Sequence, residues 1–136
     1  MKLTLFAVFE PSGPGAFMRK LEIHAAVLDE LNELENLADE CGVERLSAFG
    51  DNRELPEDFE GDPEEWSATL EPFEEWFGCD EGRKAVKGLL NAVSKNRRLA
   101  GRFENWIDLE IALIDLEREL ACGESERTRF RLELEG

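Results

Sequence analysis

Strand patterns occur near both ends of this chain, and they constrain its fold more than any other feature. Residues 128–134 alternate strictly between apolar and charged side chains, with the inward positions taken by Thr128, Phe130, Leu132 and Leu134. Such alternation is typical of a strand with one solvated face, in an antiparallel sheet or at an edge. Residues 3–9 are apolar on both faces, which indicates a strand buried on both sides.

A third segment completes the expected sheet. Residues 17–23 fit either a strand or a backward extension of the helix that follows. We favour the strand, because two strands alone rarely make a stable sheet. Strands at the two ends with helices between them predict an α+β fold. We expect one domain over residues 1–136, with a small antiparallel sheet packed against three main helices and an acidic irregular insert.

Three segments carry apolar residues at helical spacing, namely 24–41, 80–94 and 102–121. His24 stands at the start of the first helix as a surface or capping residue, Gly42 is expected to end it, and Asp80 to cap the second. The third helix has a buried stripe made of Trp106, Leu109, Leu113, Leu116 and Leu120. Its apolar face is widened by Phe103, Ile107, Ile111 and Ile114. A face this wide predicts contact with two neighbours, and a coiled-coil dimer seam is the alternative.

The charge changes sign at Gly82. Residues 54–81 contain twelve Asp and Glu and no Lys or Arg, whereas residues 83–102 contain seven Lys and Arg and no acid. We expect the basic residues to pair with the neighbouring acidic segment. Two short helices are predicted within that segment, the second from Pro72 with Phe73, Trp76 and Phe77 on one side and Gly78 as its end.

Composition restricts the classes of partner. A formal net charge of −16 disfavours binding to nucleic acid or to an anionic membrane. The three cysteines, Cys41, Cys79 and Cys122, form no Cys-x-x-Cys pair, which predicts reduced thiols and a cytoplasmic protein. With one histidine and no intact calcium-loop pattern after Asp58, we expect no metal site and no cofactor.

Clustered aromatic and charged residues mark one candidate surface. The corner formed by Trp76 and Phe77, with Glu75, Glu81 and Arg83, is the binding surface that the sequence favours. No catalytic residue and no small-molecule ligand can be named from the pattern.

Three blocks also carry a resemblance to a known family. They are residues 37–49, the pattern Glu75-Trp-Phe-x-x-x-Glu81-Gly-x-x-x-Val86-x-x-Leu-Leu90, and the pattern Asp108-Leu-Glu-x-x-Leu113-x-x-Leu-Glu117 before an alternating strand. Together they resemble a family of small bacterial cytoplasmic proteins to which no function is assigned. The resemblance implies a bacterial, soluble, single-domain protein. It transfers no catalytic residue.

These observations favour a non-enzymatic protein-interaction or regulatory domain that binds a protein partner or itself, as a homodimer. One alternative is an acidic decoy that inhibits a basic or nucleic-acid-binding protein through carboxylates of residues 54–81. Another is an enzyme that uses carboxylates or a divalent ion, which would require a cleft enclosing Glu75 and Glu81.

Overall fold

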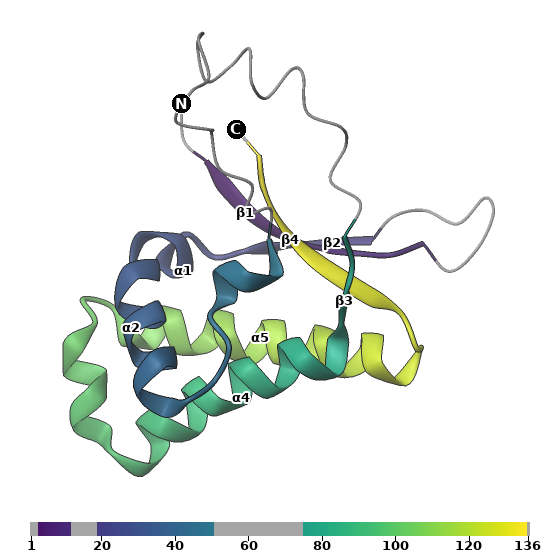
Figure 1. Cartoon of the computed structure of the whole chain (residues 1–136). Helices are drawn as coiled ribbons and strands as arrows, with labels where there is room; N and C mark the ends of the chain where they lie inside the picture. The colour runs from purple at the N-terminus through teal and green to yellow at the C-terminus, as the bar shows by residue number, and fades with distance from the viewer. Residues whose placement is uncertain (1–2, 12–18, 51–74, 136) are drawn as a thin grey trace, which may run out of the picture.

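The computed structural model describes residues 3–11, 19–50 and 75–135 (Figure 1). The strands are β1 (Thr4–Phe9), β2 (Arg19–Ile23), β3 (Phe77–Gly78) and β4 (Arg129–Glu135). The helices are α1 (Ala25–Asp29), α2 (Leu31–Cys41), α4 (Cys79–Lys95) and α5 (Trp106–Ser125), with 3₁₀ helices at Leu46–Phe49 and Arg97–Arg102. The predicted α+β class is confirmed.

The sheet joins the two ends of the chain. Its strand order is β2-β1-β4-β3, and every neighbouring pair is antiparallel. Ala7 of β1 lies opposite Leu132 of β4, so strands separated by most of the chain form the centre of the sheet. The alternation of residues 128–134 allowed β4 to be an edge strand. That alternative is wrong, because β3 pairs with the other side of β4 at Phe130 and Arg129.

The inward faces of the strands build the core. Phe9 and Phe130 are almost completely buried, and their rings lie 6.4 Å apart between centroids. Phe49 packs 5.3 Å from Phe130 and links the 3₁₀ helix Leu46–Phe49 to the sheet. On the other face of β1, Val8 is also fully buried, as expected for a strand covered on both sides, whereas Phe6 is half-buried.

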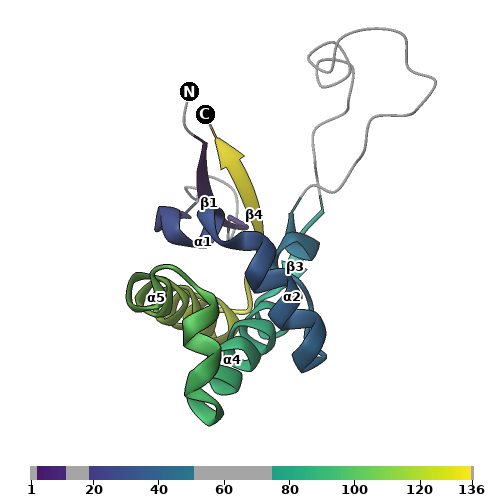
Figure 2. The same ribbon diagram turned by 90° about the vertical axis from the view of Figure 1, so that its left-hand side faces the viewer.

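The helices form a layer on one side of the sheet. In both views α4 and α5 lie side by side on that side, and α2 packs against α4 (Figure 1, Figure 2). The predicted stripe of α5 is confirmed, since its five members are all buried: Trp106, Leu109, Leu113, Leu116 and Leu120. The apolar spacing of segment 80–94 also predicts a buried stripe on α4 of Ala85, Val86, Leu89, Leu90 and Val93, and it is confirmed for all but Leu90, which is partly buried.

The first predicted helix is interrupted. Glu30 leaves helical geometry at φ −110° and ψ 21°, and it separates α1 from α2. Its carboxylate accepts a hydrogen bond from the backbone N–H of Glu104, so a contact far along the chain holds the break. The ends of the segment follow prediction: His24 Nδ1 accepts from the backbone N–H of Ala26 at 3.0 Å, and Gly42 is left-handed with φ 73°.

Several boundaries differ from the sequence-based expectation. Residues 75–78 are not helical, and Phe77 pairs in register with Phe130 of β4. Gly78, not Asp80, is the N-cap residue of α4. Helix α5 begins at Trp106, four residues later than predicted, because Asn105 caps it by accepting from the N–H of Asp108.

One buried carboxylate was not predicted. Glu35 on α2 is only 8 % exposed, and its Oε1 accepts a hydrogen bond from the backbone N–H of Ser47 at 3.2 Å. The contact connects α2 to the 3₁₀ helix that carries Phe49. Only the neighbouring turn at Ser47 explains why this carboxylate lies inside.

The cysteines provide a test of this core. Burial raises the pKa of the Cys79 thiol to about 11, while Cys41 and Cys122 are exposed. Since the thiolate is the reactive form, we expect Cys122 and Cys41 to react with a disulfide reagent at pH 8 in the native protein, and Cys79 only after unfolding. Cys41 should be the slower of the two, because burial and the neighbouring Glu40 raise the pKa of its thiol. A Cys79→Ser variant should keep two reactive thiols. Three reactive thiols in the native wild-type protein would contradict the buried position of Cys79.

Candidate functional site

The five residues nominated from the sequence lie in different surroundings. Glu75 is exposed, and the half-buried Trp76 stacks against the guanidinium of Arg131 at 4.3 Å from its ring centroid. Phe77 turns the other way and meets the Phe49 ring edge-on at 5.6 Å. The alternation of an extended chain explains the split, since neighbouring side chains point to opposite faces.

Arg83 is engaged by α5. Its Nε donates to Glu117 at 2.7 Å and its Nη1 donates to Glu124 at 3.0 Å, and these hydrogen bonds raise the pKa of the guanidinium. Arg102 is held in the same way by Glu33 and Glu40 of α2. These cations therefore pair with the helix layer, whereas the sequence favoured pairing with residues 54–81, of which 54–74 lie outside the described residues.

Phe77 and Glu81 share a hollow of about 780 Å³ next to the start of α4. Asp39 and Arg45 also line this hollow, and they form an ion pair in which Arg45 Nε donates to Asp39 Oδ1 at 2.9 Å. The pair lowers the pKa of the Asp39 carboxyl. Asp39 and Arg45 therefore neutralise one another, and Glu44, Glu81 and Lys84 are the other charged residues that line this hollow.

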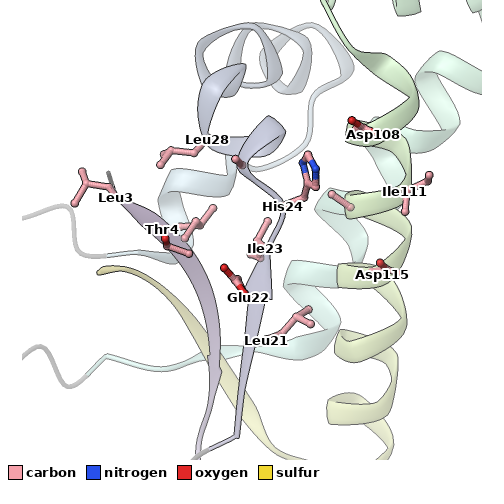
Figure 3. Close-up of a pocket in the computed structure, with 13 residues that line it drawn as sticks. Leu3, Thr4, Leu21, Glu22, Ile23, His24, Leu28, Asp108, Ile111 and Asp115 are labelled. Carbon is pink, nitrogen blue, oxygen red and sulfur yellow. The ribbon is translucent and has the colours of Figure 1, made fainter. Parts of the chain in front are cut away.

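A second pocket, of about 590 Å³, lies between the sheet and the helices (Figure 3). We call its central part the β2–α5 groove, defined by Leu21, Glu22 and Ile23 of β2 and by Asp108, Ile111 and Asp115 of α5. Figure 3 shows Asp108, Ile111 and Asp115 on α5 with Leu21 of β2 on the facing side, whereas the Glu22 side chain points to the other side of the strand. Leu3 of the segment before β1 and Leu28 of α1 extend the apolar lining.

Exposed apolar side chains adjoin this groove. Ile111 is 55 % exposed and Ile107, one turn earlier on α5, is 74 % exposed. These isoleucines were expected to widen the buried face of the helix, and that expectation is wrong for both. Helix α5 contacts α4, α1, β2 and β4, and these contacts leave Ile107 and Ile111 in solvent.

The groove has an acidic wall. Among the described residues, Asp108 and Asp115 form no ion pair. Asp108 accepts a hydrogen bond from Asn105 Nδ2 at 2.6 Å, which orients its carboxylate at the start of α5. His24, which caps α1 through Nδ1, also lines the pocket.

Sequence reasoning missed this site. The usable signal was the number of apolar residues on α5, which is larger than one buried stripe can hold. The carboxylates around it gave none, because acids spread evenly over an acidic chain do not reveal which of them meet in space.

The geometry offers no enzyme-like constellation in the part of the chain that the structure describes. Glu75 and Glu81 are both exposed, so they do not face each other inside a cleft. The same residues contain no group of three or more His, Cys, Asp or Glu side chains that could hold a metal ion. Nor does any described helix have the length and apolar character that a membrane crossing demands.

Comparison with known proteins returned no matching family model, no matching curated protein and no matching solved structure. The resemblance drawn from the sequence blocks therefore stays a prediction.

Proposed function

We propose that this protein is a non-enzymatic interaction domain that binds a protein partner in the β2–α5 groove. The observation that carries the proposal is the exposure of Ile107 and Ile111 beside a pocket of about 590 Å³. Scattered single apolar residues are normal on a protein surface, but an apolar cluster beside a hollow is typical of a binding site. The cytoplasm remains the compartment that the reduced cysteines favour.

The alternatives receive less support. An enzyme that works through Glu75 and Glu81 is disfavoured, because a general acid needs an environment that shifts its pKa and both side chains are exposed. The decoy hypothesis depends on residues 54–81, most of which lie outside the described residues. A homodimer would bring together two copies that each carry a net charge of −16, which opposes close contact between them.

Selection of random peptides displayed on phage tests the proposal. Peptides enriched on the wild-type protein should lose binding to an Ile111→Ser variant, because that substitution removes an apolar contact and leaves the fold intact. Glu81→Ser is the matched control, since it shortens another exposed helix residue in the other hollow.

The two variants separate the two surfaces. Enrichment that survives Ile111→Ser but is lost in Glu81→Ser would overturn the proposal and place binding at the Phe77 hollow. Failure to enrich any peptide that depends on Ile111 would overturn it as well. Both variants should melt at the same temperature as the wild-type protein. A loss of binding then cannot be attributed to a loss of folding.

A further inference from the structure

We infer, on the basis of the proposed function, that the partner enters the β2–α5 groove as an extended strand with the side-chain pattern basic–x–apolar–x–basic. The strand adds to the open edge of β2, its central apolar side chain enters the pocket, and its two basic side chains meet the carboxylates of α5. Three observations carry this inference: the strand order, the spacing of the α5 residues, and the unneutralised charge.

The edge of the sheet supplies the backbone contacts. β2 is the first strand in the order and pairs with β1, and no other described strand lies on its second side. An open edge presents backbone N–H and C=O groups that can pair with an incoming extended peptide. The five residues of β2 span about 17 Å, enough for a five-residue pattern.

The helix wall sets the spacing of the pattern. Asp108, Ile111 and Asp115 lie at positions i, i+3 and i+7, so they share one face of α5. The two carboxylates are then separated by about 10 Å along the helix axis, with Ile111 between them. In a strand, residues i and i+4 are about 13 Å apart and share a face with residue i+2. Long Lys or Arg side chains absorb the difference of about 3 Å.

The charge of the residues around the groove indicates which side chains the bound strand should carry. At the far end of β2, Arg19 lies 3.8 Å from Glu119 and 3.7 Å from Glu126, so those acids already have a cation. Asp108 and Asp115 form no ion pair among the described residues, and a basic strand would supply the missing cations. A second copy of this acidic chain would bring further repulsion instead.

A fluorescent peptide, acetyl-Ser-Lys-Thr-Leu-Thr-Lys-Ser-amide, is the probe for an anisotropy titration. Replacing its central Leu by Ser should weaken binding at least tenfold, because a buried leucine side chain is lost. Methylating the backbone nitrogens that face β2 should abolish binding while all side chains stay in place. Replacing both Lys by Glu should abolish it too.

Protein variants test the acidic wall separately. Asp115→Asn should weaken binding of the lysine peptide about two- to fivefold at low salt, and the difference should disappear at high salt. Asp80→Asn, another exposed aspartate on a helix, is the control and should leave binding unchanged. Backbone amide exchange of β2 residues should slow when the peptide binds.

The outcomes separate a failure of this inference from a failure of the proposed function on which it rests. If the peptide does not bind, or if backbone methylation or the loss of its leucine has no effect, the strand-addition inference is wrong. Peptides from the phage selection that need Ile111 but lack the basic–x–apolar–x–basic pattern would leave the proposed function standing and overturn the inference alone. If no peptide depends on Ile111, both fail.

Discussion

Replacing Leu113 by alanine should lower the free energy of unfolding by about 3 to 4 kcal/mol, a large effect for a single substitution. Leu113 is fully buried at the centre of the helix stripe, where α5 packs against α4 and the sheet. Truncation removes apolar surface and leaves a cavity that a packed core closes only in part. Denaturant titration followed by circular dichroism measures the loss.

Ile111→Ala is the matched control for this prediction. It shortens an apolar side chain on the same helix, but Ile111 is 55 % exposed, so stability should change by no more than about 0.5 kcal/mol. Equal losses from the two variants would mean that Ile111 packs inside the protein. In that case the exposed surface proposed for binding would not exist, and the β2–α5 groove would lose its central residue.

Gly82→Ala should destabilise the protein by about 2 to 3 kcal/mol, although alanine is the better helix former. A methyl group at position 82 would lie 2.4 Å from Cζ of Phe130 and 2.6 Å from its Cε1. The ring cannot easily move away, because Phe49 and Phe9 pack against it. Helix α4 therefore approaches the sheet so closely that only glycine fits at the contact.

Two variants check that this loss comes from the ring. Gly101→Ala places a methyl group where no atom lies within 4 Å, and it should leave stability nearly unchanged. In a Phe130→Leu background, Gly82→Ala should cost much less, because the smaller side chain leaves room for the methyl group. If Gly82→Ala costs the same in both backgrounds, the clash with Phe130 is not the cause.

Local pattern predicted the helices and strands well where one face decides the structure. The alternation around Phe130 and the stripe through Leu113 correctly predict β4 and α5, although Leu134, expected to face inward, is 53 % exposed. The caps were predicted where the signal is a single residue, as at His24 and Gly42. Asp80 shows the limit of that reasoning, because Gly78 already provides the extended residue before α4.

The candidate site could not be reached in the same way. The nominated corner, Glu75 to Arg83, is continuous in sequence, but its side chains turn toward the outer sheet face, a hollow beside α4, and α5. The β2–α5 groove joins residues about 90 positions apart, as between Glu22 and Asp115. Periodicity cannot predict such a contact. It indicates which face of each element is buried, but not which other element covers that face.

By itself the sequence determined that this chain forms an α+β fold, with terminal strands, a buried stripe on α4 and another on α5, and a strongly acidic surface. Those properties follow from the spacing of apolar side chains and from the count of charges. Only the tertiary structure decided that β4 lies inside the sheet, that Glu30 interrupts the first helix, and that Ile107 and Ile111 remain exposed. The physical reason is that each of these depends on which surface a distant element covers, and that surface is chosen by the packing of the whole chain.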